Sequence, residues 1–430
     1  MIAFETLFLG LVVGLQPVRV AVGPEVAAVE LRLDGAAIAT LTGAPWESRC
    51  DFGPAPHPHE LVAVARDGAG GELARASQWI NLPRPEAEAH LFLERDPTTR
   101  AVTSARLNWE NLETPEPRRV RITLDGTPIH VANPRSFLLP VHDPAQVHVL
   151  TAELTYSDHL TVRADAVFGG ELGEQAETRL TAVPLLLDEG TGPPSLAALQ
   201  GAFTVYGRPV RVAAIEDPPA TVVMVVDLRV DDLLRNPRLR MKTDAAGHLL
   251  AINPAYPDND RLFATFGVSD TVDRGADLLR LFPISFPFEL NLGNLEVVLG
   301  RLRFPGASPK SQLLGNAVAV AGVKAAADNR PRAVVLLLGG KGCEVGSVTP
   351  EAARAFLADL HVPLVVWSVA GATSDTCWGP ATAADWPRGL YTAFPRLRSL
   401  LDRQRIVWLE GGHLPQRVQL AADRGFKLAQ

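Results

Sequence analysis

The chain has 430 residues, of which 47% are hydrophobic and 21% are charged, and its formal net charge is −7. This composition excludes a disordered chain, a collagen and a coiled coil, and the negative charge argues against a general nucleic-acid binder. No apolar run is long enough to predict a transmembrane segment. Residues 1–183 contain 24 acidic and 15 basic side chains, whereas residues 184–430 contain 24 and 26. This change in charge predicts a domain boundary near residue 183.

The first fifteen residues are mostly apolar, as in an export signal. The segment has no basic start, however, and Glu5 lies where such a signal carries lysine or arginine. We therefore predict that the segment forms a first β-strand and that Val18–Val22 forms a second.

An internal repeat occupies the first 183 residues. Val29–Ile38 reads VELRLDGAAI, and Val120–Ile129 reads VRITLDGTPI. In both segments the alternation of apolar and polar residues predicts a strand, and the Asp-Gly pair predicts a tight hairpin turn. A later strand also recurs, at His59–Ala65 and His148–Leu154. The repeat is too long for a solenoid and predicts two β-sandwiches in tandem, joined by a linker at Pro83–Pro85.

Short strands separated by turn residues fill both repeats. In the first we predict strands at about 4–10, 17–22, 27–33, 37–42, 47–52, 60–66 and 72–81, and in the second at about 88–95, 101–109, 118–124, 136–140, 145–155 and 160–168. Together with Ala44–Trp46 and Pro58–Asp67, the first repeat resembles the bacterial immunoglobulin-like modules of cell-surface and secreted proteins. The resemblance implies a spacing or binding role. His57 and His59 have no third ligand nearby, so we predict no metal there.

The pattern changes after residue 183, where continuous apolar runs alternate with amphipathic segments. Runs buried on both faces are typical of a parallel sheet between helices. The predicted strands are Val222–Val226, Ala333–Leu338 and Val362–Trp367, with Ile406–Leu409 as the last, and the predicted helices lie at 312–327, 349–360 and 388–404. The predicted fold is two immunoglobulin-like sandwiches followed by a doubly wound, Rossmann-like α/β domain, with domains at 1–84, 85–183 and 184–430.

The order of these elements resembles the von Willebrand factor A (VWA) fold over about residues 190–415. In that family an apolar strand ends in Asp-x-Ser-x-Ser, which binds a divalent metal together with a threonine and a later aspartate. The corresponding segments are Asp227–Asp231, Asp260–Gly267, Gly306–Leu314 with Ser311 or Ser308 in the threonine position, and Val334–Gly340. The lead-in Gly201–Glu216 is similar to the segment before this domain in a bacterial group of VWA-related proteins.

The metal ligands of that family are largely replaced in this chain. Arg229 puts a permanent positive charge in the first hydroxyl position, and Gly339 replaces the later aspartate. A hard cation requires several oxygen ligands, so we predict a degenerate site without metal or cofactor. The predicted ligand face consists of Asp227, Arg229, Asp231, Ser311 and Gly339. We expect Arg229 to pair with either Asp227 or Asp231.

Three cysteines are too few for a disulfide scaffold. Cys343 and Cys377 follow two strands that the VWA-like order makes neighbours at one edge of the sheet, so a disulfide between them is predicted. Three free thiols, with Cys50 as the third, are the alternative.

An enzyme is the main alternative interpretation. Ser368, then Asp385 or Asp402, and then His413 follow the chain order of an α/β-hydrolase triad. The small residues that flank such a nucleophile are absent on one side, because position 366 is valine. We therefore predict a non-enzymatic, extracytoplasmic interaction or adhesion protein with an unidentified protein partner. A hydrolase that uses Ser368 and His413, and a cytoplasmic scaffold, remain the alternatives.

Overall fold

The computed structural model of the chain divides into two compact units. One unit joins Met1–Pro83 to Arg179–Gln430, and the other is Arg84–Thr178. The structure describes residues 2–6, 8, 10–83, 87–95, 102–111, 116–143, 146, 148–157, 160–168, 180–230, 260–267, 288–290, 295, 312–327, 329–343, 346–369, 376–384, 388–421 and 425–430. Among these residues, no helix has both the length and the apolar character needed to cross a membrane.

The first repeat forms a seven-stranded β-sandwich. Its strands are β1 (Ile2–Phe4), β2 (Leu15–Val22), β3 (Ala28–Leu33), β4 (Ala36–Leu41), β5 (Glu47–Asp51), β6 (His59–Arg66) and β7 (Glu72–Ile80). One sheet has the order β1-β2-β5 and the other β4-β3-β6-β7. Alternate side chains such as Val29, Leu31 and Leu61 are fully buried between the sheets. Six of the seven strands match predicted positions, whereas β1 overlaps the strand predicted at about 4–10 only at Phe4.

The second repeat forms a sandwich of the same topology. Its strands are β8 (Ala87–Arg95), β9 (Val102–Asn111), β10 (Arg119–Leu124), β11 (Thr127–Pro128), β12 (Ser136–Leu138), β13 (His148–Ser157) and β14 (Leu160–Phe168). The sheets β8-β9-β12 and β11-β10-β13-β14 repeat the strand order of the first sandwich. Three and four antiparallel strands packed face to face are an immunoglobulin-like arrangement, in agreement with the prediction. Only β11 was not expected, because it has just two residues.

In both sandwiches the aspartate of the Asp-Gly turn makes the same contacts with a histidine and with the main chain after it. Asp34 and Asp125 have φ angles of +52° and +50°, and each is followed by a glycine with positive φ. Asp34 Oδ2 lies 2.8 Å from Nδ1 of His59, and Asp125 Oδ2 lies 2.7 Å from Nδ1 of His148. In each case the other carboxylate oxygen accepts from the main-chain N–H after the histidine. The internal repeat therefore extends from sequence to a specific structural contact.

A six-stranded sheet forms the centre of the α/β region. Its strands are β19 (Thr221–Val226), β20 (Arg261–Phe266), β21 (Phe288–Glu289), β22 (Arg332–Leu338), β23 (Leu364–Ser368) and β24 (Thr382–Ala383), in the order β21-β20-β19-β22-β23-β24. All neighbours are parallel except β21 and β20. Every residue of β19 and β22 is buried, as the apolar runs predict.

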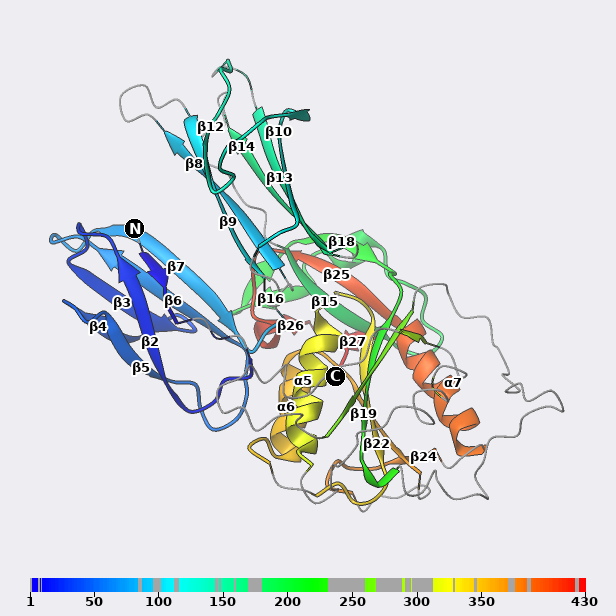
Figure 1. Ribbon diagram of the computed structural model, residues 1–430. Coiled ribbons are helices and arrows are strands. Elements are labelled where there is room, and N and C mark those ends of the chain that lie inside the picture. Colours follow the sequence, from blue (N-terminus) through cyan, green and yellow to red (C-terminus); the bar gives the residue numbers. More distant parts are fainter. Residues whose placement is uncertain are drawn as a thin grey trace. The chain divides into compact units, whose positions relative to one another are not determined.

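Helices cover both faces of this sheet (Figure 1). The helices α5 (Leu314–Ala326) and α6 (Pro350–Asp359) pack against one face, and α7 (Arg388–Asp402) packs against the other. The predicted start of α6 is confirmed, because Thr349 Oγ1 accepts a hydrogen bond from Ala352 N at 3.2 Å and Pro350 follows it.

The segments that precede and follow this sheet in the sequence form a separate antiparallel layer. It consists of β15 (Leu180–Leu187), α1 (Leu196–Leu199), β16 (Phe203–Val205), β17 (Arg208–Val210), β18 (Val212–Glu216), β25 (Gln404–Glu410), η3 (Pro415–Arg417), β26 (Val418–Leu420) and β27 (Phe426–Leu428). Its sheets have the orders β18-β25-β15-β27 and β17-β16-β26. The predicted boundary at residue 183 lies inside β15.

The strand predicted at Ile406–Leu409 belongs to this layer and not to the parallel sheet. It forms part of β25, which pairs antiparallel with β15 and β18. Val407 and Leu409 are fully buried against Val183 and Leu185 in the core of the layer. The expectation was wrong because an apolar run identifies a strand without identifying the sheet that it joins.

Candidate functional site

The order of the parallel sheet defines where a ligand site is expected. Numbered along the chain, its six strands lie in the order 3-2-1-4-5-6, with β19 as the first and β22 as the fourth. The next strand after β19, β20, lies on one side of this pair, and the next strand after β22, β23, lies on the other. In sheets of this kind ligands bind at the carboxyl ends of the two strands where the order reverses. Asp227 follows β19 and Gly339 follows β22, so two residues of the predicted ligand face lie at this switch point.

The carboxylate of Asp227 is fully buried and accepts hydrogen bonds at both oxygens. Oδ1 accepts from Arg229 N and Nε, each at 3.0 Å, and from Gln312 Nε2 at 2.8 Å. Oδ2 accepts from Arg229 Nε at 2.9 Å and from Gly339 N at 2.9 Å, and Arg229 Nη2 also lies 2.9 Å away. The sequence left Asp227 and Asp231 open as partners of Arg229, and in the structure Arg229 pairs with Asp227.

Gly339 is in contact with the backbone beside Arg229. A Cβ atom at position 339 would lie 2.6 Å from the carbonyl carbon of Arg229 and 2.7 Å from Val230 N. Such distances are far shorter than van der Waals contact. An aspartate at this position would therefore displace the loop after β19, which explains why the position tolerates only glycine in this arrangement.

The groups around Asp227 suit a carboxylate–guanidinium pair and not a metal ion. Hard cations bind through several oxygens, whereas the groups around Asp227 are N–H donors and one positive charge. Among the described residues, no cluster of three histidine, cysteine or acidic side chains has metal-binding geometry. Asp231, Ser311 and Ser308 lie outside the described residues.

Gln312 is a residue of this site that the sequence analysis missed. Its Nε2 donates to Asp227, and its Oε1 accepts from Leu228 N at 3.1 Å. The amide thus clamps the loop after β19 from a position immediately before α5. No local pattern marks a glutamine 85 residues away as the partner of Asp227.

The two histidines of the first sandwich bind separate carboxylates. His57 Nδ1 lies 2.6 Å from Asp359 Oδ2, whereas His59 is held by Asp34. Each imidazole has its own partner, so the pair does not form a common ligand set.

Cys343 and Cys377 are joined in a disulfide beside the switch point. Their Cα atoms are 5.3 Å apart, within the range that a disulfide requires. The bridge ties the Gly-rich loop after β22 to the segment before β24, where Trp378 Nε1 donates to Gly342 O at 2.9 Å. Trp378 is itself buried.

We expect alkylation to detect this bridge. With iodoacetamide, the denatured but unreduced protein should gain one label, on Cys50, and the reduced protein should gain three. In the native protein Cys50 should react slowly, because burial raises the pKa of its thiol to about 11. Mass spectrometry counts the labels. Three labels before reduction would show that the bridge is absent.

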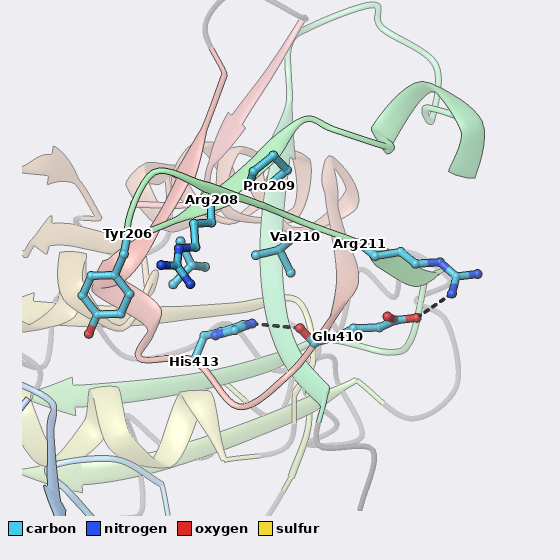
Figure 2. Close-up of a pocket in the computed structure, with 8 residues that line it drawn as sticks. Tyr206, Arg208, Pro209, Val210, Arg211, Glu410 and His413 are labelled. Carbon is cyan, nitrogen blue, oxygen red and sulfur yellow. Dashed lines mark hydrogen bonds and ion pairs between the residues drawn. The ribbon is translucent and has the colours of Figure 1, made fainter. Parts of the chain in front are cut away.

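The residues of the hydrolase alternative belong to different parts of the fold. Ser368 ends β23 in the parallel sheet and is buried, whereas His413 follows β25 in the antiparallel layer. His413 Nε2 donates to Glu410 O at 2.8 Å. Asp402 is 2.5 Å from Arg398, and Asp385 lies outside the described residues. His413 borders a pocket whose lining does not include Ser368 (Figure 2).

No protein-family model and no curated protein matches the chain. Among solved structures it is similar to the fibronectin(III)-like modules of Clostridium thermocellum CbhA, at 19% identity over 19% of this chain and 93% of that chain, with a TM-score of 0.17. A central fibronectin-III array of RIM-binding protein matches at 14% identity over 49% and 78% of the two chains, with a TM-score of 0.20. A 1.5-MDa bacterial ice-binding adhesin matches at 15% identity over 41% and 63%, with a TM-score of 0.15. At such scores these likenesses assign no function, and the architecture is defined by the chain's own two immunoglobulin-like sandwiches and parallel α/β sheet.

Proposed function

We propose that the protein is a non-enzymatic, metal-independent interaction protein whose α/β domain is of the VWA type. The observation that carries this proposal is the saturation of the Asp227 carboxylate by Arg229, Gln312 and Gly339. The Arg229 side chain supplies the positive charge that a bound divalent metal would otherwise bring. The strand order, with an antiparallel edge strand β21, supports a ligand face at the carboxyl ends of β19 and β22.

The partner of this face is expected to be a protein that carries a complementary acidic group. The side chain of Arg229 is 29% exposed, although its guanidinium pairs with the buried carboxylate of Asp227. Lys341 is exposed on the loop after β22 and adds a second cation. A fixed guanidinium can bind a carboxylate of a partner directly, without a bridging metal.

An extracytoplasmic location is part of the proposal. The disulfide between Cys343 and Cys377 supports it, because such bridges persist in oxidising compartments. The two immunoglobulin-like sandwiches would then serve as spacing or binding modules. An adhesion role agrees with this architecture, and the partner itself is not identified.

A thermal denaturation series tests the metal independence. We expect the same melting temperature in EDTA and in millimolar MgCl2 or MnCl2. An occupied site would add about 2.7 kcal/mol at a hundredfold excess of metal over Kd, a rise that is easily measured. Scanning calorimetry of the full chain is the measurement. The Arg229→Ser variant is the matched comparison, since it replaces the guanidinium with a hydroxyl beside Asp227.

A cation-dependent rise in the melting temperature of the native chain would overturn the proposal, provided that Asp227→Asn abolishes the rise. A rise that is confined to Arg229→Ser would support it instead. That result would mean that the guanidinium alone keeps the metal out of an otherwise competent site.

A further inference from the structure

A second candidate binding site lies in the antiparallel layer, apart from the parallel sheet and its switch point. The β16–β17 hairpin and the loop after β25 border a cavity of about 770 Å³ (Figure 2). This volume is within the range of cavities that bind small molecules. Val205, Pro209 and Val210 line it together with polar side chains.

The polar lining of this cavity is predominantly basic. Arg208 and Arg211 both line it and are both exposed. The only acidic lining residue is Glu410, whose carboxylate lies 3.2 Å from Arg211 Nη1. Glu410 thus offsets one of the two cations, and Arg208 remains the charge that is available to a ligand. The cavity is suited to an anion.

His413 is held in a fixed orientation on the opposite wall. Its Nε2 donates to Glu410 O at 2.8 Å, and its main-chain N donates to Thr181 Oγ1 at 2.8 Å. A Cβ on Gly411, which has a φ of +99°, would lie 2.6 Å from that Nε2, so the ring requires glycine there. Because Nε2 is engaged by Glu410 O, the imidazole is held as a fixed part of the cavity wall.

Tyr206 occupies a backbone conformation that is costly for an aromatic residue. It lies at the tip of the hairpin with a φ of +49°, followed by Gly207 at +72°. Such two-residue turns favour asparagine, aspartate or glycine. The residue is nevertheless 65% exposed, with the guanidinium of Arg417 5.5 Å from the ring centre. A strained and exposed tyrosine at the rim of a cavity indicates a contact residue.

We propose that this cavity binds an acidic peptide segment of a partner protein. Arg208 pairs with a carboxylate of that segment, and the Tyr206 ring packs on its backbone. Val205 and Val210 contact an adjacent apolar side chain. Arginine and tyrosine are the residue types that dominate the binding energy of protein interfaces, which favours a peptide over a free anion. The inference does not rest on the proposed role of Arg229, because the two sites share no residue.

Fluorescence anisotropy of a fluorescein-labelled hexaglutamate peptide with the full chain tests this assignment. We expect saturable binding that weakens with salt, and no binding of a hexaglutamine peptide. Arg208→Gln should weaken binding about tenfold, as expected when a charge-assisted hydrogen bond is lost. Arg49→Gln, which removes an exposed arginine from β5 of the first sandwich, is the matched control and should bind normally.

Tyr206→Asn distinguishes a binding role from a structural one. Asparagine tolerates positive φ, so this variant should melt at the same temperature as the native chain or higher, yet bind the peptide several-fold more weakly. Three outcomes would overturn the proposal: equal loss in Arg49→Gln, undiminished binding by Tyr206→Asn, or tighter binding of an oligogalacturonate than of the peptide. The last would assign the cavity to an acidic polysaccharide. The loss caused by Arg208→Gln should be the same in the native chain and in an Arg229→Ser background, so a failure here is separable from a failure at the switch point.

Discussion

The Asp227→Ala substitution is expected to lower the free energy of unfolding by about 4 kcal/mol, the usual cost of removing one partner of a buried ion pair. The carboxylate is fully buried and accepts from Arg229, Gln312 and Gly339. Its loss removes the negative charge that faces the guanidinium, and the acceptor of an amide and of a main-chain N–H. Urea denaturation, followed by the fluorescence of the buried Trp367 and Trp378, measures the change.

Two further variants separate this charge effect from a general loss of packing. Asp402→Ala removes a half-exposed carboxylate that pairs with Arg398, and should cost less than about 1 kcal/mol. Asp227→Ala combined with Arg229→Met should recover part of the loss, because the orphaned cation is removed as well. If Asp227→Ala alone cost no more than Asp402→Ala, the carboxylate would be hydrated and the site would be open to other ligands.

Much of the β architecture was predictable because local patterns determine it. In segments such as Val29–Leu33, alternation identifies both the strand and its buried face, and the Asp-Gly pairs at Asp34 and Asp125 identify the turns. The pairing of those aspartates with histidines could also have been predicted. His59 and His148 begin corresponding strands of the two repeats, so the repeat itself pairs each with the preceding Asp-Gly turn.

The arrangement of strands into sheets was less predictable. The apolar runs of β19 and β22 identify strands that are buried on both faces. The run at β25 has the same appearance, yet it pairs with β15, more than 200 residues earlier. Pairing of that kind depends on which partner edge is available in the folded chain. It leaves no mark on the strand's own sequence.

The candidate site was predictable at its charged residues and not at its neutral ones. Arg229 lies two residues after Asp227, close enough for the sequence alone to suggest an ion pair. Gln312 completes the site through an amide that any surface position tolerates, so its residue type carried no signal. The cavity at Tyr206 was missed because its signal is a φ angle and not a residue pattern.

The environment of His361 provides the second large effect. This residue follows α6 with a φ of +54°, is 2% exposed, and its Nε2 donates to Pro415 O at 2.9 Å. Nearby, the buried Arg332 donates to the carbonyl of Leu360, which follows α6, and to that of Ala326, the last residue of α5. Burial, and to a smaller extent the Arg332 guanidinium, lower the pKa of His361 to about 4. The imidazole is therefore neutral in the folded protein at pH 7.

The free energy of unfolding should consequently fall as the pH is lowered from 6.5 to about 4, the interval between the two pKa values of His361. Between its ordinary pKa of 6.5 and the folded-state pKa of about 4, the unfolded chain binds a proton that the folded chain does not. The free energy of unfolding therefore rises with pH across this window and is level above it with respect to this group. The full difference in pKa corresponds to about 3 kcal/mol.

The His361→Asn variant isolates this contribution. Asparagine accepts the positive φ and can donate to Pro415 O, but it does not titrate. We expect the native chain to be more stable than the variant by a constant amount between pH 7 and pH 8. This difference in the free energy of unfolding should decrease by about 3 kcal/mol as the pH falls to 4. If the substitution costs less than that in packing, the variant becomes the more stable protein at pH 4. Urea titrations at half-unit pH intervals measure the difference. A difference that stayed constant down to pH 4 would show that the folded protein protonates His361 as readily as the unfolded chain does.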